Sequence, residues 1–100
     1  MCKILVIDDE KVIINMIQQV LEMHGHDVAT ADDGGEGIQK FDSDCFDLVI
    51  TDIRMPGVDG NSVAKHIRNS NKKYVPVIGM SGTPWAFDDD SFDTIFQKPF

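Results

Sequence analysis

The stretch that decides the fold is LVITDIRMPG, residues 48–57, an apolar run that ends in a carboxylate and then turns at a Pro-Gly pair. A continuous Leu-Val-Ile run predicts a strand that is buried on both faces, and the Pro-Gly pair predicts a turn after it. Asp52 is therefore expected at the carboxyl end of a buried strand. In open α/β sheets, ligands and chemistry gather at this edge because the loops that leave the strands form a crevice there.

Hydrophobic periodicity divides the rest of the chain into alternating strands and helices. Apolar residues at spacings of three and four predict helices, and short apolar or β-branched runs predict strands. We expect strands at Lys3–Ile7, Asp27–Ala31, Phe46–Asp52, Val75–Met80 and Thr94–Gln97, and helices from Lys11 to a stop at Gly25, at Gly34–Phe41 and at Asn61–Arg68. Trp85–Asp93 has room for at most one helical turn. This alternation predicts right-handed crossovers and a parallel sheet with helices on both faces.

Size and composition restrict the class of protein further. One hundred residues without a linker-like stretch fit a single domain over residues 1–100. The apolar runs are too short to cross a bilayer and the start lacks the layout of a signal peptide, so we expect a cytoplasmic protein without membrane insertion. The formal charge of −8 argues against direct nucleic-acid binding. Cys2 and Cys45 fit no metal-binding spacing and are expected as reduced, buried thiols.

Polar residues follow successive predicted strands at the point where each strand ends. They are Asp8 and Asp9 after the first strand, Asp52 at the end of the third, Ser81 after the fourth and Lys98 after the fifth. Two like charges about 4 Å apart repel by roughly 4 kcal/mol at an effective dielectric constant near 20, so these acids call for a counter-charge. Lys98 supplies part of it, and Mg²⁺, which prefers oxygen ligands, is the natural remainder.

Each of these residues also has a purely structural interpretation. Asp9 is placed to cap the first helix, Asp52 to initiate a turn, Ser81 to serve as a loop hydroxyl and Lys98 as a solvated charge. The coincidence of all five at the ends of successive strands favours one common site.

At this point the chain resembles the receiver domains of response regulators in two-component signalling, including the chemotaxis regulators, from Lys3 to Phe100. The matching motifs are ILVIDDE at residues 4–10, DLVITDIRMPGVDG at residues 47–60, Ser81-Gly82, and Lys98-Pro99-Phe100. The resemblance implies a flavodoxin-like α/β fold, with a five-stranded parallel sheet in the order 2-1-3-4-5.

The resemblance also implies a function and a set of partners. Asp52 would accept a phosphoryl group from a sensor histidine kinase or a phosphotransfer protein, and phosphorylation would switch the binding of a downstream partner. Ser81 would hydrogen-bond the phosphoryl group and Lys98 would pair with it. The domain would catalyse only its own phosphorylation and dephosphorylation.

The metal ligands follow from the same resemblance. Asp9, Asp52 and the backbone carbonyl of Arg54 would bind Mg²⁺ directly, and Asp8 would bind it through water. A carboxylate beside a cation stays ionised at neutral pH, as a nucleophile must.

The sequence departs from the family pattern in three places. Ile95 stands where the family has its switch aromatic, with Phe92 and Phe96 close by. The short distance from Ser81 to Lys98 predicts a shortened fourth helix. We expect no fifth helix before Phe100, either as a natural feature or because the chain is truncated. The sheet face that this helix would cover is expected to bind a second copy of the chain or a partner, because large exposed apolar patches mark interaction sites.

Two other functions are consistent with the same residues. The chain could be a pseudo-receiver, a constitutive protein-binding or dimerisation module whose altered switch does not report phosphate. It could also be a small Mg²⁺-dependent phosphatase that forms an aspartyl phosphate. That class usually carries a second acid two residues after the nucleophile, and Arg54 occupies that place here.

Overall fold

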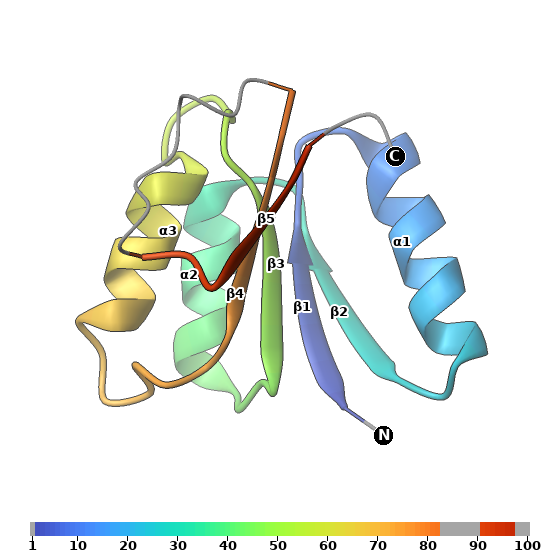
Figure 1. The fold of residues 1–100 in the computed structure, drawn as a ribbon, viewed down its shortest axis with the longest axis horizontal. Helices are drawn as coiled ribbons and strands as arrows, with labels where there is room; N and C mark the ends of the chain where they lie inside the picture. Colours follow the sequence, from blue (N-terminus) through green and yellow to red (C-terminus); the bar gives the residue numbers. More distant parts are fainter. Residues whose placement is uncertain (1, 83–90, 98–100) are drawn as a thin grey trace.

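A single parallel sheet with helices on both faces forms the molecule (Figure 1). The computed structural model describes residues 2–82 and 91–97. The strands are β1 Lys3–Ile7, β2 Asp27–Ala31, β3 Leu48–Asp52, β4 Val77–Ser81 and β5 Thr94–Gln97, and the helices are α1 Lys11–Met23, α2 Gly34–Ser43 and α3 Gly60–Arg68. The strand order is β2-β1-β3-β4-β5, which confirms the predicted flavodoxin-like topology. The predicted fourth helix falls mainly on residues 83–90, outside the described residues.

Two strands begin later than their hydrophobic patterns predict. β3 begins at Leu48 rather than Phe46, because Asp47 bonds to the start of β1 through its side chain as well as its backbone: its carboxylate accepts from the Lys3 N–H at 2.8 Å. β4 spans Val77–Ser81 rather than Val75–Met80, because the N–H of Val75 is used in a turn, where it donates to the Lys72 carbonyl at 3.2 Å.

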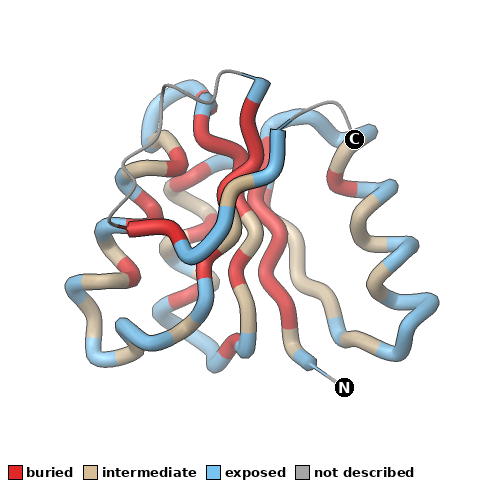
Figure 2. Tube along the Cα trace, in the orientation of Figure 1, coloured by how far each residue is buried: buried red, intermediate tan, exposed pale blue. Residues whose placement is uncertain are grey.

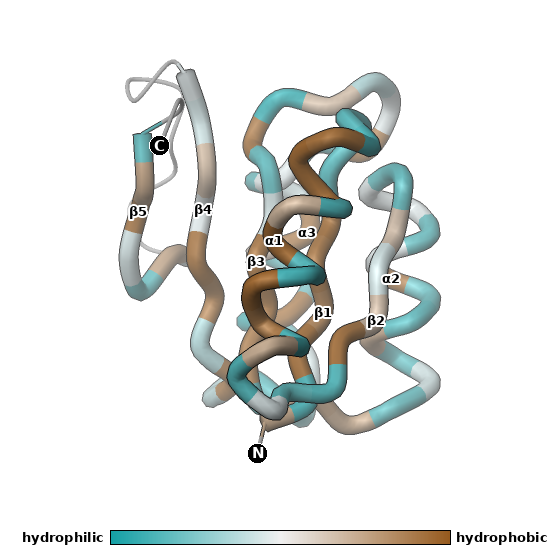
Figure 3. Tube along the Cα trace, turned by 90° about the vertical axis from the view of Figure 1, so that its right-hand side faces the viewer, coloured by the Kyte–Doolittle hydropathy of each residue, from teal (hydrophilic) through white to brown (hydrophobic). Residues whose placement is uncertain are grey.

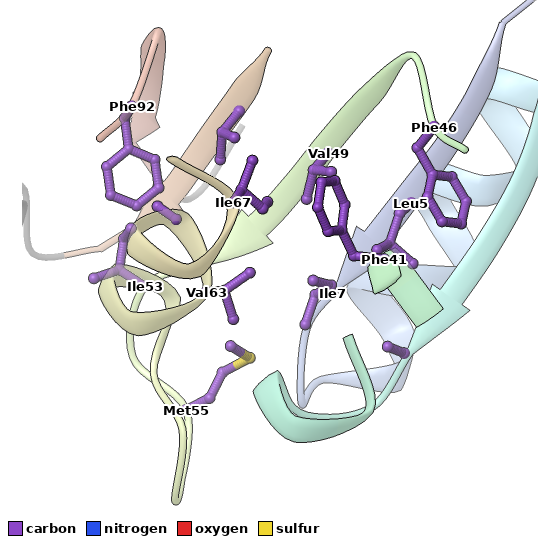
Figure 4. Packing of buried hydrophobic residues seen from close by; sticks show 13 residues of the cluster. Leu5, Ile7, Phe41, Phe46, Val49, Ile53, Met55, Val63, Ile67 and Phe92 are labelled. Carbon is purple, nitrogen blue, oxygen red and sulfur yellow. The ribbon is translucent and has the colours of Figure 1, made fainter. Parts of the chain in front are cut away.

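The main core lies between the sheet and helices α2 and α3 (Figure 4). Alternate residues of a strand face opposite sides of a sheet, so β1 contributes to two separate clusters. Leu5 and Ile7 pack toward α2 and α3, and Ile4 and Val6 pack toward Ile14 of α1. The central strands β1, β3 and β4 are accordingly the most continuously buried part of the described chain, whereas the edge strands β2 and β5 are only partly buried (Figure 2).

Helix α1 leaves part of its face of the sheet open. It packs against β1 and β2, while β4 and β5 stand to one side of it (Figure 3). The open part is an apolar groove of about 310 Å³, lined by Ile17, Ile50, Ile78, Met80 and Phe96. The Phe96 side chain is 54% exposed. An uncovered apolar face, predicted from the sequence, is therefore present among the described residues.

The amino-terminal edge of the sheet carries the two cysteines, and both are exposed free thiols. The expectation that they are buried is wrong, since Cys2 precedes β1 and Cys45 lies in the loop before β3, outside the layers of the core. Lys3 and Asp44 form an ion pair at the same edge. A hydrogen bond from the Lys3 ammonium holds the pKa of the Asp44 carboxyl below its ordinary value and raises the pKa of Lys3.

No helix among residues 2–82 and 91–97 has the length and apolar character needed to cross a bilayer.

Candidate functional site

Carboxylates from two neighbouring strands meet at the carboxyl edge of the sheet. Oxygen atoms of Asp8, Asp9, Glu10 and Asp52 all lie within 4.8 Å of one another. β1 and β3 are adjacent and parallel, so their carboxyl ends lie side by side. The predicted convergence of Asp8, Asp9 and Asp52 is confirmed, and Glu10 joins them.

Asp8 is the most deeply buried residue of this acidic group and is held by hydrogen bonds. It is 0% exposed, its N–H donates to the Ala31 carbonyl at 3.2 Å, and its carboxylate accepts from the Glu10 N–H at 2.9 Å. Asp9 is exposed and does not cap helix α1: the N-cap residue is Glu10, and no side chain caps the helix there. The interpretation of Asp9 as a helix cap is therefore wrong, and its side chain is available to the acidic group.

Asp52 ends β3 and is only 5% exposed. The next N–H, that of Ile53, donates to the Met80 carbonyl of β4 at 3.0 Å and to the Asp52 carboxylate at 3.0 Å. The N–H of Gly60 donates to the Ile53 carbonyl at 2.8 Å and brings the start of α3 against the same backbone. These bonds fix the backbone of Ile53, directly after Asp52, from two sides.

An open cleft of about 540 Å³ lies beside the end of β3 and is lined by Ile53, Arg54, Met55, Pro56, Asp59 and Asn61. The Arg54 side chain is exposed. The cleft lies along the loop that follows Asp52, and Arg54 places a positive charge at its border. The predicted role of the Arg54 backbone carbonyl as a metal ligand stays a prediction.

Ser81 is the last residue of β4 and is 2% exposed. It pairs across the sheet with Gln97, the last residue of β5. Ser81 therefore ends at the same edge as the acidic group, in agreement with its predicted position. Lys98 follows Gln97 directly in the chain but lies outside the described residues.

The place of the family's switch aromatic is taken by a core residue. Ile95 is partly buried and packs against the α2 and α3 side of the sheet together with Phe92. Phe96 lies on the opposite side, where it lines the apolar groove. Phe92 and Phe96 therefore pack on opposite sides of the sheet, and neither takes the place that the family's switch aromatic would have at residue 95.

The acidic group fits a hard divalent cation. Its donors are all carboxylate oxygens, which are the ligands that Mg²⁺ prefers, and two atoms bound to one Mg²⁺ at about 2.1 Å lie at most about 4.2 Å apart. Oxygens within 4.8 Å of one another suit an ion that some carboxylates contact directly and others reach through water. Asp8, Asp9 and Asp52 therefore lie close enough together to share one ion, while the predicted role of each as a direct or water-mediated ligand stays a prediction.

Known proteins of similar sequence define the class. The chain matches the Response regulator receiver domain family over residues 4–91. It is 36% identical over 103 aligned positions to the alkaline phosphatase synthesis transcriptional regulatory protein PhoP of Bacillus subtilis (strain 168), an alignment that covers 98% of this chain and 42% of PhoP. The chain thus spans under half the length of this curated relative.

Solved structures agree with this assignment. The response regulator protein TrrA of Thermotoga maritima, solved in complex with Mg(2+)-BeF, superposes with a TM-score of 0.91 at 37% identity over 100% of this chain and 89% of that one. The chemotaxis response regulator CheY4 of Vibrio cholerae gives a TM-score of 0.93 at 29% identity over 100% of this chain and 88% of that one. This chain belongs to the response regulator receiver domain family of two-component signalling.

Proposed function

We propose that this receiver domain accepts a phosphoryl group on Asp52 from the phosphohistidine of a sensor histidine kinase or a phosphotransfer protein. The observation that carries the proposal is the gathering of Asp52 with the Asp8 and Asp9 carboxylates within 4.8 Å at the carboxyl edge of the sheet. Asp52 is nearly buried, and the loop that follows it, from Ile53 onward, lines an open cleft, where the donor protein would approach.

In the proposed step, a carboxylate oxygen of Asp52 attacks the phosphorus atom. The phosphorus–nitrogen bond of the phosphohistidine breaks, its electron pair leaves with the imidazole, and an acyl phosphate forms on Asp52. Phosphoryl transfer depends on positioning and on charge neutralisation more than on acid-base chemistry. The hydrogen bonds around Ile53 that fix the end of β3 provide the positioning.

Mg²⁺ would be held by Asp9, Asp52 and the backbone carbonyl of Arg54, with Asp8 bound through water. When bound, the ion supplies positive charge against the transferring phosphoryl oxygens. Binding of Mg²⁺ by a related receiver, the Thermotoga maritima protein in complex with Mg(2+)-BeF, supports this assignment.

Two further side chains would act on the phosphoryl group. The Ser81 hydroxyl would donate a hydrogen bond to it, which the position of Ser81 at the end of β4 supports. The Lys98 ammonium would pair with it. The domain would act only on its own acyl phosphate, as a cytoplasmic switch rather than an enzyme with external substrates.

The output of the switch is proposed to pass through the open sheet face. The apolar groove between α1 and β5 would bind a downstream protein or a second copy of this chain, because exposed apolar surface of this kind marks protein interaction sites.

The proposal is tested by phosphorylation with acetyl phosphate and Mg²⁺, followed by intact-mass spectrometry. The wild-type protein is expected to gain the mass of one phosphoryl group, and hydroxylamine should remove it, as it cleaves acyl phosphates. Asp52→Asn should abolish the gain. Asp27→Asn, which makes the same substitution at the amino-terminal start of β2, should leave it unchanged.

An adduct that persists in Asp52→Asn would refute the assignment of the phosphoacceptor. A wild-type protein that gains no mass would favour the constitutive binding module instead.

A further inference from the structure

Thr51 is the residue of β3 directly before Asp52, and the reaction proposed above gives it no role. Its side chain is fully buried, with 0% exposure. A buried hydroxyl needs a hydrogen-bond partner, and the Thr51 hydroxyl donates to the main-chain carbonyl of Asp52 at 2.9 Å. The buried polar group of Thr51 is therefore bound to the backbone of the residue that would accept the phosphoryl group.

The Asp52 carbonyl is one end of the peptide group that joins Asp52 to Ile53, and a peptide group is planar. The other end of this plane is the Ile53 N–H, which donates to the Asp52 carboxylate and to the Met80 carbonyl, each at 3.0 Å. The Thr51 hydroxyl and the Met80 carbonyl thus hold opposite ends of one rigid plane. Rotation of that plane would carry the N–H donor away from the Asp52 carboxylate.

The carbonyl that accepts from Thr51 lies on an enclosed side of β3. The start of α3 is so close that a Cβ atom on Gly60 would lie 2.1 Å from the Asp52 carbonyl oxygen. Thr51 faces the same side of β3 as Val49, a residue of the main core, because alternate residues of a strand share a face. Removal of the hydroxyl would leave the carbonyl without this donor in a place where packing restricts the entry of water.

We propose that Thr51 is a positioning residue for phosphoryl transfer: its hydroxyl fixes the peptide group after Asp52 and thereby orients the carboxylate that attacks phosphorus. The inference rests on the proposed function, which makes Asp52 the nucleophile. The attacking oxygen must lie in line with the leaving group, so the orientation of the carboxylate affects the rate. Thr51 acts only through Asp52 and contacts neither the phosphoryl group nor the ion.

The test is a time course of phosphorylation with acetyl phosphate and Mg²⁺, followed by intact-mass spectrometry. Thr51→Val keeps the shape of the side chain and removes the hydroxyl. Its rate should fall by about tenfold, because a misplacement of about 1 Å can cost roughly 100-fold and the loss of one orienting bond should move the carboxylate by less. Thr51→Ser keeps the hydroxyl and should retain most of the rate.

Thr51→Ala separates orientation from packing and also serves if Thr51→Val fails to fold. The serine and alanine variants lack the same buried methyl group, so both lose its packing and they differ only in the hydroxyl. Urea denaturation reports the free energy of unfolding of each variant. Orientation by Thr51 predicts that the rate follows the hydroxyl, so that the alanine variant is about as slow as the valine variant and the serine variant is not.

Thr94→Val is the matched control, because Thr94 is an exposed threonine at the amino-terminal start of β5, and its rate should equal that of the wild type. Wild-type rates in Thr51→Val would overturn the role of Thr51 and leave the proposed function standing. Equal slowing in Thr51→Ser and Thr51→Ala would reduce Thr51 to a packing residue. A wild-type protein that gains no phosphoryl group would overturn the proposed function together with this inference.

Discussion

Gly60 shows how the absence of one side chain positions helix α3. A Cβ atom at this position would lie 2.1 Å from the Asp52 carbonyl oxygen and 2.7 Å from the Ile53 Cα atom. Both neighbours are backbone atoms, so rotation of a side chain cannot relieve the overlap. The first turn of α3 therefore lies against the backbone of the proposed phosphoacceptor only because residue 60 is glycine.

Gly60→Ala is expected to lower the free energy of unfolding by about 2 kcal/mol or more, since inserting an atom into a closely packed backbone contact forces the elements apart. Gly35→Ala is the control, because a Cβ there would meet only the Asp33 carboxylate at 3.4 Å, an ordinary contact. Alanine has the better helix propensity, so Gly35→Ala should raise the free energy of unfolding by up to about 1 kcal/mol. Urea denaturation measures both, and equal effects would contradict the packing role of Gly60.

The sequence predicts the charged residues of the site better than the glycines around it. The meeting of Asp8 and Asp52 follows from the shared direction of parallel strands, which the hydrophobic pattern reveals. The glycines of α2 indicate only low helix propensity in the sequence. In the structure, a Cβ at Gly34 would lie 2.2 Å from the Val58 carbonyl oxygen, a tertiary contact that no local pattern reports.

Arg68, at the end of α3, links three segments near the edge of the sheet. Its guanidinium donates to the Ser91 carbonyl at 3.1 Å, to the carbonyls of Lys73 and Val75 at 2.7 and 2.8 Å, and to the Asp93 carboxylate at 2.5 Å. The same Asp93 oxygen accepts from the Val77 N–H of β4 at 2.7 Å. Arg68 thus holds the segment before β5 and the loop before β4 together.

Arg68→Lys is expected to lower the free energy of unfolding by about 1–3 kcal/mol, because a lysine keeps the charge but cannot supply the planar fork of donors. Hydrogen exchange should accelerate in β4 and β5 more than in β1 and β2. Lys73→Gln, at an exposed lysine of the same loop, should change neither measurement. Uniform acceleration over all strands would show that Arg68 has no special link to β5.

The sequence does not predict which side chains of the segment around β5 enter the core. Phe92 and Phe96 stand on either side of Ile95 in the chain, and the sequence does not show which ring enters the core. In the structure Phe92 is buried and Phe96 is exposed. The Phe92 ring packs so closely on Gly79 that a Cβ atom at residue 79 would lie 3.0 Å from it. Phe92 precedes the strand, so its direction depends on the path of the chain rather than on the alternation of β5.

At the scale of the whole molecule, a net negative charge is combined with an open apolar groove on the part of the sheet that the structure describes. The chain has a formal charge of −8, which opposes non-specific association of copies. A partner or a second copy that covers the groove between α1 and β5 would bury its apolar side chains. The free energy gained by that burial can exceed the repulsion between like charges. Phe96 is the most exposed of the residues that line the groove.

Phe96→Ser is expected to weaken self-association or partner binding at this face by about tenfold or more, since burying a phenylalanine contributes roughly 2 kcal/mol. Tyr74→Ser is the control, because Tyr74 is an aromatic residue with 86% exposure that lies away from the groove. Sedimentation velocity over a range of protein concentrations measures self-association. A wild-type protein that sediments as a monomer at every concentration would contradict the second copy as the occupant.

The exposed thiols of Cys2 and Cys45 lie at the amino-terminal edge of the sheet, whereas the acidic group lies at the carboxyl edge. A maleimide dye or a bead attached through either sulfur would therefore sit on the far side of the domain from Asp52. Immobilised or fluorescent preparations can be made from the native cysteines without crowding the edge where the donor protein must arrive.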